Sequence, residues 1–359
     1  MKIVFRADAS EEIGSGHVMR CLSLARNLRD RGAECHFICR QFDGNLAASI
    51  SDFGFGLTLL NGPTPEGQRY LGNSENFTYR QWLGCSQFED AIAVADIIGN
   101  LSADWLVVDH YGIDKDWENI VSLTGAKIFV IDDLADRTHF ADVLLDQTFG
   151  RSAIDYKKLV NDNCRLLVGS DFALLRPEFR KYRTRAVEQR KSRKLNNLLV
   201  SLGGVDKDNF TQRVLQTLEN CDLPSNLDIS VVVGEKCPWI SQLTDAAAQF
   251  DGDCKLLVGV QNMAALMARA DLAIGASGTS SWERCALGLP SIQLIIAENQ
   301  RLIAENLAKV GAIKLAKSLD EIPAAINTRH HWMEKISDKS ASLVDGLGSY
   351  RAAEVILGH

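Results

Sequence analysis

Short apolar runs, many of them rich in Val and Ile, alternate with longer amphipathic stretches along the whole chain. This alternation is typical of βα units, in which parallel strands form a sheet and the intervening helices cover it. In the first half, the pattern predicts helices over Val18 to Arg31 and Phe88 to Leu101. It predicts strands at Lys2 to Arg6, Cys35 to Cys39, Asp104 to Asp109, Lys127 to Ile131, Val143 to Asp146 and Arg165 to Val168. The predicted fold class is α/β.

The same pattern starts again in the second half of the 359-residue chain, which is long enough for two domains of about 150 residues or more. Strands are predicted at Asn197 to Leu202, Asp228 to Val233, Cys254 to Val258, Asp271 to Ile274 and Ser291 to Ile295. Residues 181–194 are densely basic with almost no apolar face, which favours a solvated linker over a patch that binds phosphate or nucleic acid. We therefore predict an N-terminal domain at 1–180 and a C-terminal domain with C-terminal helices at 195–359.

The stretch from Asn61 to Trp82 interrupts the pattern of the first half. It holds few apolar residues and contains two prolines, Pro63 and Pro65, followed by Gly67. Such a composition is typical of a surface loop. We expect this stretch to be a surface excursion of the first domain.

Composition and charge narrow the function classes. Lys and Arg number 39 and Asp and Glu 46, so the net charge of −7 gives no basic field to hold nucleic acid or an anionic membrane. No apolar stretch approaches the roughly 18 residues of a membrane span. Nine cysteines without a C-x-x-C pair suit reduced thiols and a cytoplasmic location. We expect a small-molecule partner and, since no heptad pattern demands a second chain, a monomer or weak oligomer.

A glycine-rich turn follows the first predicted strand and leads into a helix at about Val18. It contains Gly14 and Gly16 and is followed directly by His17. Met19 occupies the place of the third glycine of a dinucleotide-binding G-x-G-x-x-G motif, so that fingerprint is absent. A turn at the carboxyl end of the first strand faces the ligand crevice in such folds. His17 at a helix N-terminus would favour the neutral imidazole that accepts a proton, although a structural histidine is the alternative.

Two further strand ends carry polar side chains. Asp109, His110 and Tyr111 follow the apolar run Val107-Val108, and Asp132-Asp133 follow Ile131. Parallel strands end at one edge of a sheet, so these groups are expected near the first turn. Capping of the next helix by the aspartates is the alternative interpretation.

The second half contains a candidate nucleotide site. Gly203 and Gly204 end one strand, and Ser277, Gly278 and Thr279 follow another. Backbone N–H groups in such turns can approach a diphosphate closely. One helical turn further, Glu283 offers a carboxylate to the two hydroxyls of a ribose, while Asn299 and Gln300 offer amides to a sugar.

Metal chemistry is not expected. The paired acids Asp114/Asp116, Asp206/Asp208 and Asp251/Asp253 have no histidine or cysteine support. Neither a metal nor a cofactor is therefore predicted.

Together, these motifs resemble one family closely. They are F-R-A-D-A-S-E-E-I-G-S-G-H-V-M-R-C-L, V-D-H-Y-G-I, D-F-A-L-L-R-P-E-F at Asp171 to Phe179, S-L-G-G-V-D, and S-G-T-S-S-W-E with the later N-Q. The family comprises the UDP-2,4-diacetamido-2,4,6-trideoxy-β-L-altropyranose hydrolases of pseudaminic acid biosynthesis, hereafter PseG-type hydrolases, whose product sugar serves surface glycans such as those on flagellin. The resemblance spans Met1 to about Leu315, and the second half is also similar to the UDP-binding half of MurG-type glycosyltransferases.

The resemblance implies a GT-B-like fold, with two Rossmann-like domains whose parallel sheets face a central cleft. It implies that His17 is the catalytic base and that Tyr111 is an active-site tyrosine near it. It further implies that Gly278, Thr279 and Glu283 hold UDP and that Asn299 and Gln300 lie near the sugar.

From the motifs and this resemblance together, we add Gly16, Asp109, Gly203, Gly204 and Ser277 to the expected substrate-binding residues. The expected reaction is metal-independent hydrolysis of the C1–O bond with inversion. A glycosyltransferase of the same fold and a nucleotide-sugar-binding module without chemistry remain alternatives.

Overall fold

The computed structural model describes residues 1–64, 79–191 and 194–358. The chain forms two compact units, the first made of Met1–Arg176 with Gly348–His359 and the second of Pro177–Leu347. Part of the predicted excursion, residues 65–78, and residues 192–193 of the predicted linker lie outside the described residues.

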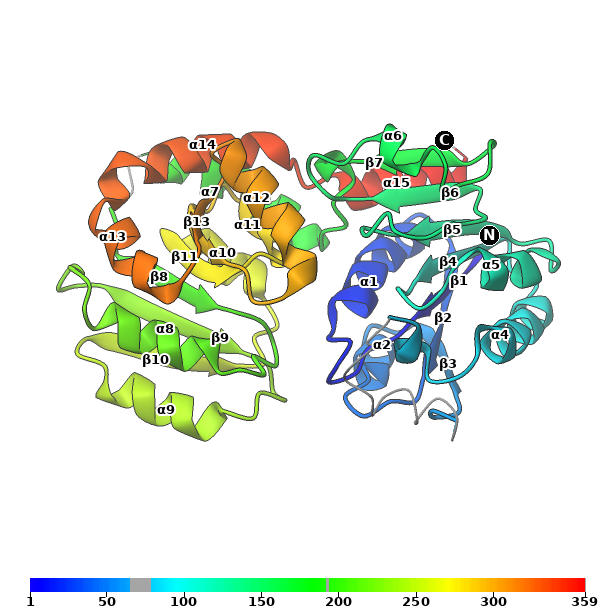
Figure 1. Cartoon of the computed structure of the whole chain (residues 1–359), viewed down its shortest axis with the longest axis horizontal. Helices are drawn as coiled ribbons and strands as arrows, with labels where there is room; N and C mark the ends of the chain where they lie inside the picture. Colours follow the sequence, from blue (N-terminus) through cyan, green and yellow to red (C-terminus); the bar gives the residue numbers. More distant parts are fainter. Residues whose placement is uncertain (65–78, 192–193, 359) are drawn as a thin grey trace. The chain divides into compact units, whose positions relative to one another are not determined.

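The first unit is built on a seven-stranded parallel sheet in the order β3-β2-β1-β4-β5-β6-β7 (Figure 1). Its strands are β1 (Lys2–Ala7), β2 (Glu34–Arg40), β3 (Gly56–Leu60), β4 (Trp105–Asp109), β5 (Lys127–Ile131), β6 (Val143–Asp146) and β7 (Arg165–Val168). The helical segments are α1 (Gly16–Arg29), α2 (Ala47–Asp52), η2 (Tyr79–Leu83), α4 (Gln87–Leu101), α5 (Lys115–Ser122), α6 (Ala153–Tyr156), η3 (Ser170–Phe172) and α15 (Gly348–Leu357).

Successive side chains of each strand point to opposite faces of this sheet, and both faces are buried. On one face, Phe5, Val107 and Phe129 pack with residues of α1 and α15. On the other face, Val4 and Leu106 pack with residues of α4 and α5. The odd-numbered residues of β1, β4 and β5 therefore point to α1, and the even-numbered ones to α4 and α5.

The second unit repeats this design with a six-stranded parallel sheet in the order β10-β9-β8-β11-β12-β13. Its strands are β8 (Asn197–Ser201), β9 (Asp228–Val233), β10 (Asp253–Val258), β11 (Leu272–Ala276), β12 (Ser291–Leu294) and β13 (Lys314–Ala316). The helical segments are α7 (Pro177–Arg190), α8 (Phe210–Leu218), α9 (Ile240–Gln249), α10 (Met263–Arg269), α11 (Ser280–Ala286), η4 (Glu298–Gln300), α12 (Arg301–Lys309), η5 (Leu319–Glu321), α13 (Ile322–Asn327), η6 (Arg329–His331) and α14 (Met333–Leu343). The predicted α/β class with two parallel sheets is confirmed.

The structure places the basic stretch and the C-terminus differently from the domain boundaries that the sequence predicts. Most of the predicted linker belongs to α7, a helix of the second unit whose buried Arg190 donates to the carbonyl groups of Leu287 and Met267. The last helix, α15, returns to the first unit, where Ala352 and Ile356 pack in the core beside α1. Ser349 fixes its start by donating to the carbonyl of Leu175.

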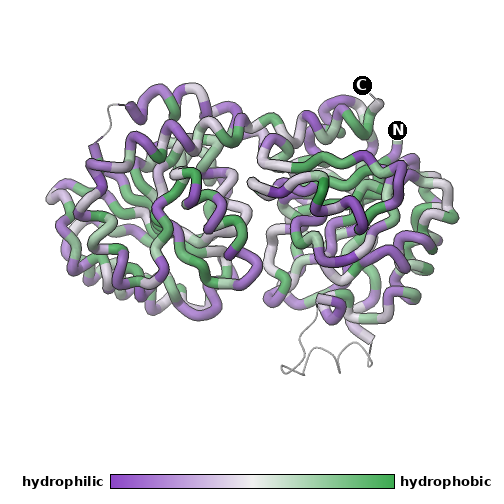
Figure 2. The backbone as a smooth tube through the Cα atoms, turned by 45° about the horizontal axis from the view of Figure 1, so that its top comes forward, coloured by the Kyte–Doolittle hydropathy of each residue, from purple (hydrophilic) through white to green (hydrophobic). Residues whose placement is uncertain are grey.

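The distribution of hydrophobic and hydrophilic residues agrees with this arrangement of buried strands and surrounding helices. Figure 2 shows hydrophobic stretches along the strands inside each unit and hydrophilic stretches mostly on the surrounding helices and loops. Among the described residues, no helix combines the length and the apolar character that a membrane crossing requires.

Candidate functional site

Two features bring the predicted site residues of the first unit together. They are the alternation of side chains along β4 and the position at which helix α1 begins. Asp109, the last residue of β4, follows Trp105 and Val107 on the face that α1 covers. The turn before α1 contains Gly14 in the left-handed region, with φ 77°, and its N–H donates to the carbonyl of Ser10. This tight turn lets α1 begin at Gly16, so His17 lies in the first turn of the helix.

His17, Asp109 and Arg20 form one buried group. The Nδ1 of His17 lies 2.6 Å from Asp109 Oδ1. Arg20, one helical turn further along α1, donates from Nε to Oδ2 and from Nη2 to Oδ1 of the same carboxylate, at 2.6 and 2.7 Å. The carboxylate is thus held by a bidentate arginine contact, which fixes its orientation toward the imidazole.

The charges of this group determine which histidine nitrogen is free to react. Burial alone would raise the pKa of Asp109, but Arg20 and His17 lower it below its usual range. The ionised carboxylate accepts the Nδ1 proton of His17, so the neutral ring has its lone pair on Nε2. Among the described residues, Nε2 has no hydrogen-bond partner. His17 is therefore arranged to accept a proton at Nε2.

Tyr111 joins this group through a second aspartate. Its O–H donates to Asp133 Oδ1 at 2.5 Å, and Arg20 Nη1 donates to Oδ2 of Asp133 at 2.7 Å. Burial and the nearby Asp133 raise the pKa of Tyr111 well above its usual value, so the phenol stays protonated. Its ring packs edge-on against His17, with centroids 4.5 Å apart.

Two aromatic residues that no sequence motif indicated complete the surroundings of His17. Trp82 and Tyr79 of η2 pack on Tyr111 at centroid distances of 5.8 and 5.1 Å, and Trp82 also meets His17 edge-on at 6.2 Å. Both come from the end of the predicted surface excursion. Because this stretch is polar and its aromatic residues follow neither a helical nor a strand period, the sequence could not predict where Tyr79 and Trp82 lie.

A separate charged network lies on the opposite face of the sheet, to which the even-numbered residues of β1 and β4 point. Arg6 pairs with Asp8 at 2.6 Å and with Asp90 of α4 at 2.8 Å. His110 Nδ1 accepts the N–H of Gly112, and its Nε2 lies 3.4 Å from Asp8 Oδ2, but neither of these last two atoms makes a hydrogen bond among the described residues. His110 thus packs in the loop that carries Asp109 and Tyr111, next to a buried set of ion pairs.

The buried His110 predicts a pH dependence of stability. Burial lowers its pKa to about 4, whereas the unfolded chain binds the same proton near pH 6.5. The unfolded state therefore holds more protons between these values, and the free energy of unfolding falls as the pH drops through this range. The stability advantage of the wild type over His110→Gln is expected to shrink by about 2 kcal/mol between about pH 7 and pH 4.5 in urea unfolding. An advantage that is constant with pH would contradict this.

The predicted nucleotide-binding residues lie at the carboxyl ends of three neighbouring strands of the second unit. Gly203 and Gly204 follow β8, and Ser277 to Thr279 follow β11, which pairs with β8. Gly203 adopts φ 129°, a conformation that favours glycine, and both glycines are exposed. Glu283 is half-buried in α11, while Asn299 is exposed and Gln300 half-buried after β12. Sheet order thus gathers these residues at one edge.

A buried arginine stabilises the loop after β11 through hydrogen bonds. Arg284 is 1% exposed and donates to the carbonyl of Ala276 and to the hydroxyl of Ser281. Burial lowers the pKa of Arg284 to about 10. Ser277 Oγ is also buried, and no hydrogen-bond partner for it exists among the described residues. Among the described residues, the loop after β11 thus contains a buried hydroxyl that makes no hydrogen bond.

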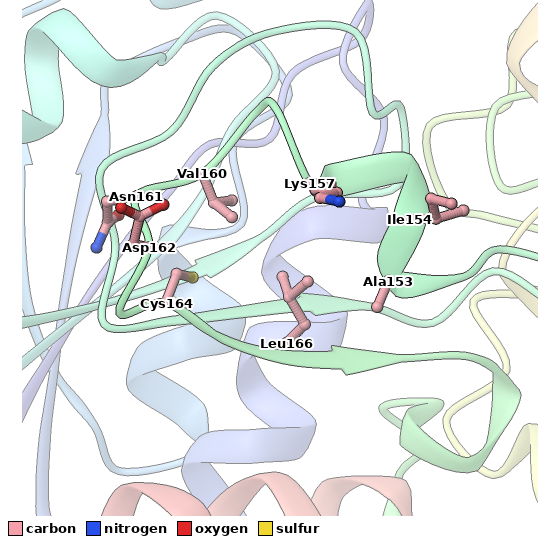
Figure 3. A pocket seen from close by; sticks show the side chains of 8 residues that line it. All are labelled: Ala153, Ile154, Lys157, Val160, Asn161, Asp162, Cys164 and Leu166. Atoms are coloured by element: carbon pink, nitrogen blue, oxygen red, sulfur yellow. The ribbon is translucent and has the colours of Figure 1, made fainter.

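A cavity lies apart from these residues, within the first unit. It has a volume of about 380 Å³ and lies along α6 and the loop that leads to β7 (Figure 3). Ile154, Val160 and Leu166 contribute apolar side chains to its lining, and Lys157 also lines it. None of the predicted site residues lines it. Across residues 1–64, 79–191 and 194–358, no three His, Cys, Asp or Glu side chains are grouped as metal ligands.

Comparison with known proteins shows related sequences, although no protein-family model matches the chain. UDP-2,4-diacetamido-2,4,6-trideoxy-beta-L-altropyranose hydrolase of Campylobacter jejuni is 28% identical over 312 residues, which cover 87% of this chain and 97% of that protein. The resemblance to the PseG-type hydrolases is confirmed. Spore coat polysaccharide biosynthesis protein SpsG of Bacillus subtilis is 27% identical over 317 residues, covering 87% of this chain and 82% of SpsG. The uncharacterized protein MJ1062 of Methanocaldococcus jannaschii is 28% identical over 305 residues, and the chain spans 57% of its length.

Solved structures of other proteins share the fold of this chain. MurG of Acinetobacter baumannii has a TM-score of 0.69 at 16% identity, and the match covers 100% of this chain and 99% of MurG. The glycosyltransferase SsfS6 of Streptomyces sp. SF2575, complexed with thymidine diphosphate, has a TM-score of 0.66 at 12% identity, with 100% of both chains covered. The predicted GT-B-like fold is thus confirmed, and the resemblance to PseG-type hydrolases and to MurG extends over both units.

Proposed function

We propose that the protein hydrolyses UDP-2,4-diacetamido-2,4,6-trideoxy-β-L-altropyranose to UDP and the free sugar. The name of the Campylobacter jejuni relative supports the substrate class, and the likeness to nucleotide-sugar enzymes supports the use of a UDP-sugar. The single observation that carries the proposal is the contact between His17 Nδ1 and Asp109 Oδ1, because it prepares Nε2 to activate a water molecule.

In the proposed reaction, a water molecule attacks C1 of the sugar. His17 Nε2 takes one proton from the water as its oxygen bonds to C1, and Asp109 stabilises the imidazolium that forms. The bond between C1 and the diphosphate oxygen breaks with oxocarbenium-like character at C1, and its electron pair leaves with UDP. Attack from the side opposite to UDP inverts the configuration at C1.

We assign UDP to the second unit. The backbone N–H groups of Gly203, Gly204, Ser277, Gly278 and Thr279 would stabilise the growing charge on the diphosphate. Glu283 would accept hydrogen bonds from the ribose hydroxyls, and Asn299 and Gln300 would face the sugar. In the first unit, we assign a substrate-binding role to Gly16, the first residue of α1.

Substitution of Glu283 tests its proposed contact with the ribose. Glu283→Gln keeps the size of the side chain but removes its charge, so UDP affinity is expected to fall about tenfold because a hydrogen bond to a charged acceptor is worth roughly 1.5–3 kcal/mol. Isothermal titration with UDP measures this. Glu298→Gln, at an exposed position in η4, is the matched control and should bind UDP as the wild type does. Equal affinities of the wild type and Glu283→Gln would contradict the assignment.

A glycosyltransferase is the second candidate, because MurG and SsfS6 share the fold. The two reactions differ in whether water or an acceptor hydroxyl attacks C1. Release of UDP and free sugar by the purified protein without any acceptor supports hydrolysis. A substrate that stays intact until an acceptor sugar is added would instead support transfer.

A further inference from the structure

An aromatic wall lies beside the proposed base and comes in part from a segment without any sequence motif. We define the aromatic wall as Tyr79, Trp82 and Tyr111. Tyr79 meets Trp82 edge-on at 4.9 Å and Tyr111 at 5.1 Å, while Trp82 and Tyr111 are nearly parallel at 5.8 Å. Trp82, Tyr111 and His17 are 9%, 8% and 7% exposed, so all three reach the surface to the same small extent.

The segment that carries Tyr79 and Trp82 is anchored to the strand ends of the site. A Cβ atom at Gly112 would lie only 2.8 Å from the carbonyl oxygen of Tyr79, so the close approach of η2 requires glycine there. Arg80 pairs with Asp114 at 2.7 Å. Both contacts involve residues that closely follow Tyr111, and they position η2 against the loop after β4.

The wall presents mostly ring carbon atoms, because Nε1 of Trp82 is buried. The hydroxyl of Tyr111 is engaged by Asp133, so this ring offers its face and edges to a neighbour. Methyl and CH groups gain from packing on aromatic rings, whereas a hydroxyl pressed against them loses its hydrogen bonds to water and pays for desolvation.

The inference rests on the proposed hydrolysis, in which C1 lies next to the water at His17 Nε2. The ring carbons that flank the C1 region carry an acetamido group at C2 and, across the ring oxygen, a methyl group at C5. The acetamido group has an N–H and a carbonyl that need polar partners, whereas the methyl group needs none. We propose that the aromatic wall receives the C5 methyl group and thereby selects 6-deoxy sugars over sugars with a hydroxyl at C6.

The test compares kcat/KM for two substrates in each protein variant. One is the proposed UDP-sugar, and the other is the same molecule with a hydroxymethyl group in place of the C5 methyl. Because an apolar pocket discriminates against one added hydroxyl by about 10²-fold, the wild type is expected to prefer the 6-deoxy substrate by about that factor. Trp82→Ala should reduce the preference about tenfold, while Trp82→Phe, which keeps an aromatic face, should stay within about threefold of the wild type.

A ratio measured in one protein sample does not depend on the fraction that is folded. Tyr79→Ser tests the wall at a more exposed position, in case Trp82→Ala does not fold. Phe88→Ala, at a residue of α4 that is 65% exposed, is the control and should keep the wild-type preference. An unchanged preference in Trp82→Ala and Tyr79→Ser would overturn the inference while leaving the hydrolase intact. A wild type that hydrolyses neither sugar would overturn the proposed function itself.

Discussion

Replacing His17 by Asn is expected to lower kcat by about 10³-fold while the affinity for UDP stays close to that of the wild type. Asn is similar in size and can still meet Asp109, but it has no basic nitrogen in the place of Nε2, so the water is no longer deprotonated as it attacks. UDP is assigned to the second unit, and the substitution leaves its contacts untouched. Steady-state UDP release and titration calorimetry separate the two effects.

A matched control for this substitution is His36→Asn. His36 is a partly buried histidine of β2 in the same unit, and its Nε2 lies 2.8 Å from Thr58 Oγ1. Its replacement should change kcat by less than about twofold. Near-normal turnover of His17→Asn would remove His17 from the role of base.

Asp109→Asn is expected to lower kcat by about 10² to 10⁴-fold and to reduce stability by about 3 kcal/mol. The neutral amide cannot stabilise an imidazolium at His17, and it leaves Arg20 with Asp133 as its remaining carboxylate partner. Activity is therefore measured per folded molecule, at a temperature well below the unfolding midpoint of the variant, and stability by urea unfolding.

Asp90→Asn controls for the loss of a buried carboxylate. Asp90 is fully buried and pairs with Arg6 and Arg40 on the opposite face of the sheet, so its replacement should cost comparable stability. The kcat of the folded variant should stay within about tenfold of the wild type, since His17 is not contacted. Equal losses of kcat in both variants would mean that the effect of Asp109 is general and not specific to the imidazole.

Much of the fold followed from the sequence because strands buried on both faces leave a strong signal. β1, β4 and β5 each contain a run of three or four apolar residues, and each was predicted to within about a residue or two. β3 and β13 were missed. Gly56–Leu60 lies at the edge of its sheet with largely half-buried or exposed residues, and Lys314–Ala316 has three residues, so neither produces a long apolar run.

The path of the C-terminus depends on tertiary packing and not on local pattern. α15 has an ordinary amphipathic face that would suit either unit, and its small residues Ala352 and Ala353 fit beside α1 of the first unit. The sequence of this helix does not indicate which of the two units it packs against. Boundaries drawn along the chain cannot represent a unit that is assembled from two separate segments.

In the candidate site, too, some residues could be predicted from the local sequence, whereas the positions of others depend on the tertiary fold. The neighbourhood of His17, Asp109 and Tyr111 was expected from strand ends, since parallel strands finish at one edge. Arg20 was not singled out, although its spacing of three residues from His17 on one helix places both on the same face and was a usable signal. Tyr79 and Trp82 gave no such signal, because their position depends on how η2 folds back onto Gly112 and Asp114.

We propose that the His17–Asp109 pair activates water for attack on C1. Time-resolved proton NMR of the purified protein with UDP-2,4-diacetamido-2,4,6-trideoxy-β-L-altropyranose, in the presence of EDTA and without an acceptor, tests it most directly. We predict that UDP is released and that the free sugar first appears as the opposite anomer, before mutarotation mixes the two signals. First appearance of the retained anomer, or a substrate that stays intact until an acceptor or a metal ion is supplied, would contradict the account.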